Sequence, residues 1–444
     1  MKVVIAGGGT GGHLFPGIAI AQEFKRLAPE SLPSNGSIGG SNRGREGSTE
    51  VLFVGTENGI ESRIVPREGF EIRYISAEGL KGRGILKKVK SVCKIPIGII
   101  QSIKILNSFR PDIVIGVGGY ASGAVGAASF LLGYPLVIQE QNLFPGVTNR
   151  ILGRFANLIF TSFEETGKFF PAPLIFKKGN GRRVCLTGNP IRRGIVECGR
   201  QNADIELQFS APNSSPYTVK FTILIFGGSQ GAHSINKAMA DGLEYLAKFK
   251  DSIFIIHQAG ITDCEFVKKS YEKIGFESEV VPFIHNMADS YKKADLIICR
   301  AGATTISEIT ACGKASILIP FPFAANNHQE MNAHVLKDNG AAEMIIEKDL
   351  SGEVLANKIL FLMQSRTRLL EMERGSKKMG KPDAAKEIVE QCYELLKSKE
   401  TGFTVQDSES INIGNYKKIS HRFSQIFKNI FFSVFLCKSV FICG

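Results

Sequence analysis

The chain contains two glycine-rich turns, each of which follows a short apolar segment and precedes a helical pattern. The first runs from residues 2–6 into Gly7–His13, and the second runs from residues 221–226 into Gly227–Ala232. Such a turn lets backbone N–H groups and the positive end of a helix approach a phosphate closely. One turn is weak evidence, because glycine also forms ordinary tight turns. Two of them, each opening its own series of strands and helices, predict twin α/β domains that face a shared cleft and handle a diphosphate-linked substrate.

Both halves alternate short β-rich runs with helical patterns, which predicts parallel sheets with right-handed crossovers. In the first half the expected strands are 2–6, 50–55, 71–75, 112–116, 135–139 and 158–161, and the expected helices are 13–27, 60–68, 86–109, 120–132 and 146–154. In the second half strands are expected near 221–226, 252–257, 279–282, 295–299, 315–319 and 342–346. We therefore predict an α/β protein with two doubly wound, Rossmann-like domains.

Three segments fall outside this alternation. Residues 179–201 are rich in Gly, Arg and Asn-Pro and form the best candidate for a domain boundary, which we place near residue 188. Residues 29–49 have the composition of a mobile loop. Residues 399–444 begin polar and end basic and rich in phenylalanine, which fits either a disordered extension or a helix that touches a membrane. A helix expected over 383–398 could pack on either domain.

Composition limits the partners. The net charge of +12 favours an anionic partner. Nucleic acid would be the default, but the chain has no helix-turn-helix, RNP-like or zinc-finger pattern and no Trp. An anionic membrane surface or a phosphorylated substrate explains the charge equally well. The nine cysteines form no CxxC pair, which favours a reducing cytoplasm. We expect no signal peptide and no membrane span, since no apolar run reaches about 18 residues.

Polar side chains in the first half follow strands at the sheet edge where ligands gather. His13 stands in the first turn of its expected helix, where a neutral imidazole can accept a hydroxyl proton. A bond to neighbouring backbone is the alternative. A third glycine cluster, Gly116–Gly123, follows another strand, and Glu140 and Asn142 stand where the next strand ends. These groups should line one crevice with His13, although Glu140 and Asn142 could instead cap the helix after Pro145.

The second half has two comparable segments. Cys299–Glu308 runs from a strand through small residues into a helix, so a ligand can approach the backbone. Glu308, one turn inside, could accept hydrogen bonds from both ribose hydroxyls, or could simply face solvent. Pro320–Ala333 places amide side chains before a helix, where they could read sugar hydroxyls or cap the helix. The candidates for bonds to sugar hydroxyls are Asn326, Asn327, His328 and Gln329.

Together these segments resemble the MurG family of N-acetylglucosaminyltransferases of peptidoglycan synthesis, and thus of cell-wall formation, cell shape and division. The matching pieces of the first half are Gly8–His13 with Pro16-Gly17, Gly118–Tyr120, Glu140–Asn142 and Gly188–Arg192. Those of the second half are Gly227–Ala232, Arg300–Thr304 with Ser307-Glu308, and Asn327–Gln329 with Asn332-Ala333. The resemblance covers residues 1–398 in colinear order, which is far more specific than any single motif.

The resemblance implies a GT-B glycosyltransferase fold with an interdomain cleft. Residues 1–187 should form the domain on the membrane side that receives the acceptor, and 188–381 the domain that binds the UDP-sugar. Residues 382–398 should return to the first domain, whereas 29–49 and 399–444 have no family counterpart. The substrate contacts carried over from the family are Thr10, Gly11, Gly12, Asn142, Arg192, Ser229, Ile284, Ala303, Thr304, Thr305, Ile306, Ser307, Glu308 and Gln329.

The implied reaction transfers N-acetylglucosamine from UDP to the 4-hydroxyl of an undecaprenyl-diphosphate-linked muramyl pentapeptide (lipid I to lipid II), with inversion to a β-1,4 bond. Direct displacement needs a base for the hydroxyl and stabilisation of the leaving UDP. We expect His13 as the base, with Glu140 and Asn142 positioning the acceptor. Ser229 and the Gly228–Ala232 amides should hold the diphosphate. The family usually has His where Gln139 stands, which argues against a base there.

Some alternatives stay open at this point. The protein could be a UDP-sugar transferase with another glycolipid acceptor, or an epimerase-like protein that needs no acceptor. No Asp-x-Asp run is present, so we expect no metal and no cofactor. The segment 81–104 carries seven basic residues and no acidic one, interspersed with Leu and Ile. A solvated helix face is one explanation, but a lipid-borne acceptor favours peripheral binding to anionic headgroups at the cytoplasmic face of the inner membrane.

Overall fold

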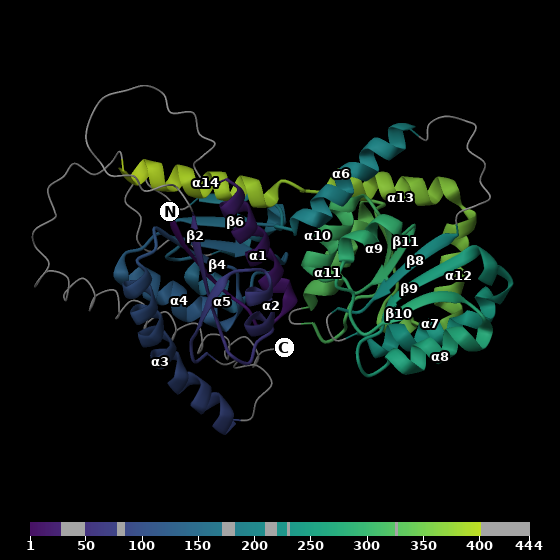
Figure 1. The fold of residues 1–444 in the computed structure, drawn as a ribbon, viewed down its shortest axis with the longest axis horizontal. Helices are drawn as coiled ribbons and strands as arrows, with labels where there is room; N and C mark the ends of the chain where they lie inside the picture. Colours follow the sequence, from purple (N-terminus) through teal and green to yellow (C-terminus); the bar gives the residue numbers. More distant parts are fainter. Residues whose placement is uncertain are drawn as a thin grey trace, which may run out of the picture. The chain divides into compact units, whose positions relative to one another are not determined.

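The computed structural model describes residues 1–27, 49–77, 85–170, 183–208, 220–228, 231–324 and 327–400 (Figure 1). The chain divides into two compact units. Unit 1 comprises Met1–Pro190 together with the segment that begins at Ala384, and unit 2 comprises Ile191–Asp383. Each unit is built on its own parallel sheet with helices on both faces, which confirms the predicted fold class.

The sheet of unit 1 has seven parallel strands. In spatial order they are β3 (Glu71–Tyr74), β2 (Glu50–Gly55), β1 (Lys2–Ala6), β4 (Ile113–Gly116), β5 (Leu136–Glu140), β6 (Leu158–Thr161) and β7 (Arg183–Leu186). The helices of this unit are α1 (Gly11–Arg26), α2 (Glu61–Arg67), α3 (Ile85–Phe109), α4 (Gly119–Leu132), α5 (Val147–Leu152) and α14 (Ala384–Glu400), with a 3₁₀ turn over Glu164–Phe169.

The sheet of unit 2 has six parallel strands. In spatial order they are β10 (Glu277–Val281), β9 (Ile253–Gln258), β8 (Phe221–Phe226), β11 (Leu296–Cys299), β12 (Ala315–Leu318) and β13 (Ala342–Met344). The helices are α6 (Arg193–Gln208), α7 (His233–Leu246), α8 (Cys264–Ile274), α9 (Met287–Lys293), α10 (Ala303–Cys312), α11 (His328–Asp338), α12 (Gly352–Gln364) and α13 (Arg366–Met379).

Both sheets place their sites by the same topology. The first strand of each unit lies between the second and the fourth, so the direction of strand addition reverses at β1–β4 in unit 1 and at β8–β11 in unit 2. Ligands of doubly wound sheets bind outside the carboxyl ends of the strands at this reversal. The two glycine turns follow β1 and β8 directly, so each turn stands at the ligand-binding edge of its own sheet.

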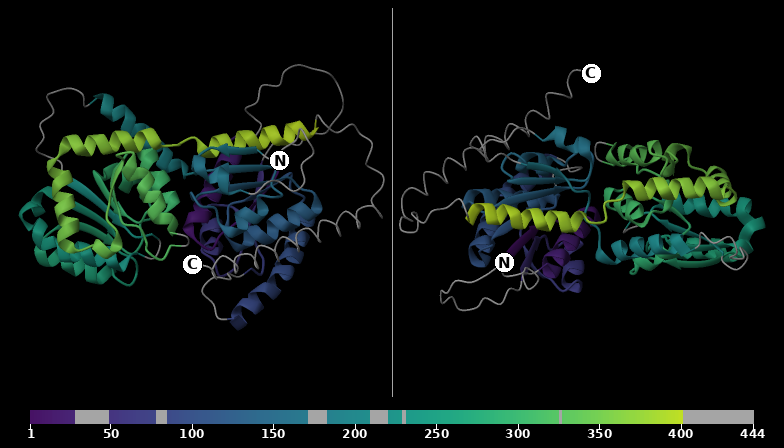
Figure 2. Two further views of the ribbon diagram at one scale, coloured as in Figure 1. Left: turned by 180° about the vertical axis from the view of Figure 1, so that it is seen from behind. Right: turned by 90° about the horizontal axis from the view of Figure 1, so that it is seen from above.

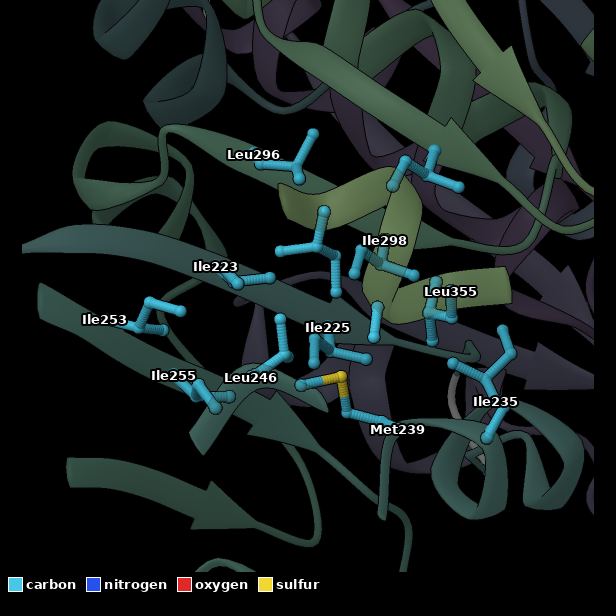
Figure 3. Close-up of a cluster of buried hydrophobic side chains, with 14 of the residues drawn as sticks. Ile223, Ile225, Ile235, Met239, Leu246, Ile253, Ile255, Leu296, Ile298 and Leu355 are labelled. Carbon is cyan, nitrogen blue, oxygen red and sulfur yellow. The ribbon is translucent and has the colours of Figure 1, made fainter. Parts of the chain in front are cut away.

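Alternate residues of the central strands supply two cores in each unit. In unit 2, Ile223 and Ile225 pack on one face of β8 with Met239 of α7 and Leu355 of α12 (Figure 3). Leu224 and Phe226 point to the other face, where they pack with the helices α6, α9, α10 and α11. A strand buried on both faces is predominantly apolar, which explains the continuous apolar run over residues 223–226 of β8.

Helix α14 packs on unit 1, against α1 (Figure 2). Ile388, Val389 and Cys392 are fully buried in the core that also contains Val3 and Ile5. The Tyr393 ring meets the Phe24 ring edge to face at 5.9 Å, and its hydroxyl donates to the carbonyl of Leu27. Burying apolar side chains of this size contributes about 1.5–3 kcal/mol each, so packing holds this helix on unit 1.

The strands and helices predicted from the sequence differ from the structure mainly near residues 179–208, where the chain passes from unit 1 to unit 2. Strand β7 and helix α6 both lie within or across residues 179–201, where we expected only a boundary. β7 is an edge strand of four residues, and its apolar run of three residues is too short to predict a strand, although Val184 and Leu186 are apolar and exposed. The expected mobile loop 29–49, except Thr49, lies outside the described residues. So does the expected extension 399–444, except its first two residues, which belong to α14. None of the helices within the described ranges is long and apolar enough to cross a membrane.

Candidate functional site

His13 lies in the first turn of α1, directly after the first glycine turn. Its Nδ1 atom lies 3.1 Å from Oε1 of Gln141, which follows β5. Gly118, after β4, has a φ of +100°, and a Cβ added there would lie 2.7 Å from the same Nδ1. Gly118 must therefore lack a side chain for the ring to lie here. Backbone after β4 and an amide after β5 together fix the imidazole at the reversal point of the sheet.

Glu140 is a buried carboxylate that organises the loop after β5. Its Oε1 accepts from the backbone N–H of Asn142 at 3.0 Å and from Nδ2 of Asn142 at 3.3 Å. Its Oε2 accepts from the Gly146 backbone at 3.1 Å and from Nδ2 of Asn149 at 2.9 Å. These bonds fix the Asn142 side chain, which is only half-buried. The arrangement supports a role for Glu140 that is exerted through Asn142.

A second buried carboxylate, Glu61 of α2, holds the first glycine turn. It accepts from the Gly9 backbone N–H at 2.8 Å, the Thr56 backbone N–H at 2.9 Å and the Thr56 hydroxyl at 2.8 Å. Gly9 is thus tied to the loop after β2, and its N–H is occupied by protein. Sequence reasoning missed Glu61, because nothing in the local pattern of α2 sets it apart from an ordinary surface glutamate.

Gln139 has no access to a substrate. Its side chain is fully buried, and its Nε2 donates to the carbonyl of Gly188 at 3.3 Å.

Unit 2 contains a cavity of about 580 Å³ at its own reversal point. It opens at the carboxyl ends of β8 and β11 and the first residues of α7. Its lining residues are Phe226, Gly227, Gly228, Gly231, Ala232, His233, Ser234, Arg300, Gly302, Thr305, Phe321, Gln329 and Glu347. Glycine backbone and the N-terminus of α7 give one wall the character of an anion site. A nucleoside diphosphate suits this chemistry and volume.

Gln258, at the end of β9, fixes the second glycine turn. Its Nε2 donates to the carbonyl of Gly228 at 2.7 Å, and its Oε1 accepts from the backbone N–H of Ile284 at 2.8 Å. The side chain is buried, so these two bonds join the turn to the loop after β10. This is how Ile284, a contact expected from the family, lies next to the glycine turn.

Arg300 supplies a buried cation to the cavity. Its guanidinium donates to the carbonyls of Ile319 and Pro320, at 3.1 and 3.2 Å, and to the hydroxyl of Ser234 at 3.0 Å. It also pairs with Glu347. Five N–H donors in a rigid fork allow such a residue to hold its loop and still meet an anion. Sequence reasoning gave Arg300 as part of a motif but assigned it no role.

Glu308, on α10, lies almost fully buried rather than facing solvent. Its Oε1 pairs with Nη2 of Arg192 at 3.1 Å, and its Oε2 accepts from the Tyr291 hydroxyl at 2.9 Å. Burial and the neighbouring Glu308 raise the pKa of Tyr291, so this phenol stays protonated and can donate. Each carboxylate oxygen still has a lone pair for a ribose hydroxyl. Arg192 and Glu308, two of the expected contacts to the donor substrate, therefore form an ion pair with each other.

The remaining expected contacts are distributed as follows. Within Ala303–Glu308, Thr305 lines the cavity, and Ser307 donates to the carbonyl of Ala303 at 2.9 Å. Gln329 also lines the cavity, and its Oε1 accepts from the Phe321 backbone at 3.0 Å, which leaves its NH₂ group to donate. Asn327, the residue just before α11, is exposed, and its Nδ2 donates to Oε2 of Glu330 at 2.6 Å. In unit 1, Thr10 and Gly12 are exposed beside His13.

Two of the expected residues, Ser229 and Asn326, lie outside the described residues, so their contacts are not placed.

A polar network runs from the cavity into the core of unit 2. His233 of α7 lines the cavity, and its Nδ1 lies 2.9 Å from Oδ2 of Asp263. Asn236 donates to the same Asp263 oxygen at 2.8 Å and contacts Nε2 of the fully buried His257 at 3.0 Å. Burial, acting as a penalty on the charged form, lowers the pKa of His257 to about 3. His233 thus adds an imidazole to the cavity that sequence reasoning missed.

Across the described ranges, no group of three or more His, Cys, Asp and Glu side chains is arranged to hold a metal ion. Six cysteines are free thiols: Cys185, Cys198, Cys264, Cys299, Cys312 and Cys392. Burial raises the pKa of Cys392 and of Cys299, so neither is a nucleophile.

Comparison with known proteins identifies the fold. The model of the glycosyltransferase family 28 N-terminal domain matches residues 3–31 and 45–161, and that of the family 28 C-terminal domain matches residues 222–388. The chain belongs to glycosyltransferase family 28. The N-terminal domain model of this family matches unit 1, and the C-terminal domain model matches mainly unit 2.

Relatives of this family 28 chain extend over nearly all of it. The UDP-N-acetylglucosamine–N-acetylmuramyl-(pentapeptide) pyrophosphoryl-undecaprenol N-acetylglucosamine transferase of Myxococcus xanthus is 45% identical over 396 residues, which cover 89% of this chain and 93% of that protein. The protein of the same name from Geotalea uraniireducens is 46% identical over 391 residues, with coverages of 88% and 97%. These relatives confirm the resemblance predicted from the motifs.

Solved structures share the fold of this chain. The crystal structure of Acinetobacter baumannii MurG aligns with a TM-score of 0.63 and 28% identity, covering 89% of this chain and 99% of that one. The UDP-GlcNAc 2-epimerase of Neisseria meningitidis, solved with UDP-GlcNAc bound, aligns with a TM-score of 0.59 over 89% of this chain and 100% of that one. At 14% identity, the epimerase shows only that the fold is shared.

Proposed function

We propose that this protein transfers N-acetylglucosamine from UDP-N-acetylglucosamine to the 4-hydroxyl of the undecaprenyl-diphosphate-linked muramyl pentapeptide, inverting the anomeric carbon to form a β-1,4 bond. The observation that carries the proposal is the identity of about 45% with transferases of this name over 89% of the chain. The motif residues of that family also stand at the ligand-binding edges of both sheets. The reaction supplies the lipid-linked disaccharide from which peptidoglycan is made.

Unit 2 binds the donor in this proposal. The backbone N–H groups after β8, the N-terminus of α7 and the Arg300 guanidinium offer positive potential to the diphosphate. The His233 imidazole also lines this cavity, with its Nδ1 side turned to Asp263. Glu308, held by Arg192 and Tyr291, accepts from the ribose hydroxyls. The NH₂ group of Gln329 donates to a hydroxyl of the sugar, since its oxygen is already bound to protein.

Unit 1 supplies the chemistry on the acceptor. His13 takes the proton of the 4-hydroxyl while the new C1–O bond forms and the bond from C1 to the UDP oxygen breaks. The electron pair leaves with UDP, whose developing charge is stabilised by the donors around the diphosphate. Asn142, fixed by Glu140, positions the acceptor. Glu140 is a positioning residue here, because its carboxylate is bonded to the loop after β5 and to Asn149 of α5.

We also propose peripheral attachment to the cytoplasmic face of the inner membrane, through residues 81–104 and the basic tail. The described part of α3 supports this. Ile97 and Ile100 are large apolar side chains that are about half exposed, and Lys104 is exposed on the same helix face. A stripe of exposed isoleucines near basic residues suits a headgroup surface that also carries the acceptor.

The test is incubation of the purified full chain with sugar-labelled UDP-N-acetylglucosamine, with and without the lipid-linked acceptor. The proposal predicts that label enters lipid only when the acceptor is present, in a β-1,4 linkage. Transfer to a different glycolipid, with none to the muramyl acceptor, would reassign the acceptor. Conversion of the donor in the absence of any acceptor would support an epimerase-like activity instead.

A further inference from the structure

Gln141 connects His13 to the backbone of the neighbouring strand by two hydrogen bonds. Its Nε2 donates to the carbonyl of Val117 at 2.8 Å, and its Oε1 lies 3.1 Å from Nδ1 of His13. The carbonyl of Val117 can only accept, so the amide must present its nitrogen to Val117. Its oxygen then faces His13. The hydrogen bond to the Val117 carbonyl therefore fixes which end of the amide faces His13.

An amide oxygen can only accept, so the hydrogen of this second bond must come from Nδ1 of His13. A neutral imidazole has one N–H, and the other ring nitrogen carries a lone pair. We propose that Gln141 is a positioning residue that holds neutral His13 in the Nδ1–H tautomer, so that Nε2 is the atom that takes the acceptor hydroxyl proton. This inference rests on the proposed role of His13 as the base.

The surroundings of Gln141 make this constraint strong. Its side chain is 1% exposed, so water cannot replace either bond. Turning the amide over would set its oxygen against the Val117 carbonyl and its NH₂ group against the imidazole, so the bond to Val117 would be lost. Gly118 packs against the ring at Nδ1, which keeps the imidazole from swinging away. Gln141, Val117 and Gly118 thus define both the place and the tautomer of one catalytic ring.

The proton path is then complete. Nε2 of His13 accepts the hydroxyl proton as the acceptor oxygen bonds to the anomeric carbon and UDP departs. The resulting imidazolium has an N–H on both nitrogens, and its Nδ1–H stays bonded to Gln141. A neutral amide needs no change of its own protonation at any stage. The wrong tautomer would present an N–H to the acceptor hydroxyl and could not remove its proton.

The test uses the ring ¹⁵N signals of His13 in the full chain labelled with ¹⁵N-histidine, at a pH where the ring is neutral. The His13 signals are those lost in His13→Gln. The Nδ1–H pattern is expected in the wild type and in Gln141→Glu, which keeps an acceptor at this place. Gln141→Met, which keeps the length but neither bond, should move the ring toward the Nε2–H form. An Nε2–H wild type, or an unchanged tautomer in Gln141→Met, would overturn the proposal.

The second measurement is steady-state kinetics of the same variants. Gln141→Met should lower kcat by at least about tenfold while KM for both substrates changes by no more than about twofold. The matched control is Gln22→Met, on the outer part of α1, with wild-type kcat. If His13→Ala and Gln141→Met both keep wild-type kcat while the tautomer shifts as expected, the base assignment fails and the tautomer assignment stands. If His13→Ala loses activity and Gln141→Met alters neither tautomer nor kcat, Gln141 has no such role.

Discussion

At the scale of single residues, the function of a polar side chain depends on which of its atoms are already bonded to protein. Both carboxylate oxygens of Glu140 are bonded to the loop after β5 or to Asn149 of α5, so Glu140 acts on a substrate only through Asn142. Each carboxylate oxygen of Glu308 has one protein partner, Arg192 or Tyr291, and a further lone pair that can accept a hydrogen bond from a ligand. Gln329 binds Phe321 through its oxygen and keeps its NH₂ group for the cavity. Three similar polar groups thus receive three different tasks.

The NH₂ group of Gln329, which has no hydrogen bond to the part of the chain that the structure describes, predicts a loss of sugar selectivity when it is removed. Gln329→Ala should reduce the preference for UDP-N-acetylglucosamine over its 4-epimer by about tenfold or more, because a site built around a hydroxyl discriminates through that bond. The measurement is the ratio of kcat/KM for the two donors. Gln364→Ala, at the exposed end of α12, is the control. An unchanged ratio in Gln329→Ala would place the selecting group elsewhere in the cavity.

At the scale of elements, the sequence predicted most of what apolar burial dictates. The strands β1, β2, β6 and β8 have the expected bounds, because each is a buried apolar run between turn residues. The edge strand β7 was missed, since its apolar run of three residues is short. The roles of Glu61, Gln141 and Gln258 were also missed. Each bonds partners from other loops, as with Glu61 and Gly9, 52 positions apart, and no local pattern encodes such pairs.

The contact of α2 with the first glycine turn predicts a stability effect. In Glu61→Gln, an NH₂ group replaces one carboxylate oxygen and meets N–H donors of Gly9 or Thr56. A buried donor without an acceptor costs about 1–3 kcal/mol, so the free energy of unfolding should fall by that amount. Urea titration followed by circular dichroism measures it. Glu68→Gln, exposed just after the same helix, should change the value by less than about 0.5 kcal/mol. Equal effects of the two substitutions would contradict the account.

The polar network between α7, β9 and α8 predicts a pH dependence. The pKa of His257 is about 3 in the folded protein, against about 6.5 in an unfolded chain. Between these values the unfolded state binds one more proton, so stability falls as pH falls from about 6.5 toward 3. The contribution is at most about 1.4 kcal/mol per pH unit.

Urea unfolding between pH 6.5 and 5 tests this. His257→Gln should show a shallower loss of stability than the wild type, because the titrating group is gone. The exposed His285 offers a control, and His285→Gln should keep the wild-type slope. The same slope in all three proteins would mean that His257 does not control the pH dependence.

At the scale of the whole molecule, the basic charge and the exposed isoleucines of α3 predict salt-sensitive membrane binding. Binding to anionic vesicles should weaken steeply as ionic strength rises, since charge attraction is screened over about 8–10 Å near physiological salt. Lys87→Glu with Lys88→Glu should weaken it further in a flotation assay. A chain truncated after Lys399 should retain most of the binding. If the truncated chain loses all binding and the double variant loses none, the tail is the anchor.

We propose that unit 2 binds the donor and that His13 of unit 1 removes the proton of the acceptor hydroxyl. The most direct measurement is kcat of His13→Ala at saturating donor and acceptor, with the Kd of UDP determined on the same protein. The account predicts that kcat falls by at least about a hundredfold, which is the contribution of a general base, while the Kd of UDP stays within about twofold of the wild type. Turnover near the wild-type value would contradict the account and remove His13 as the base.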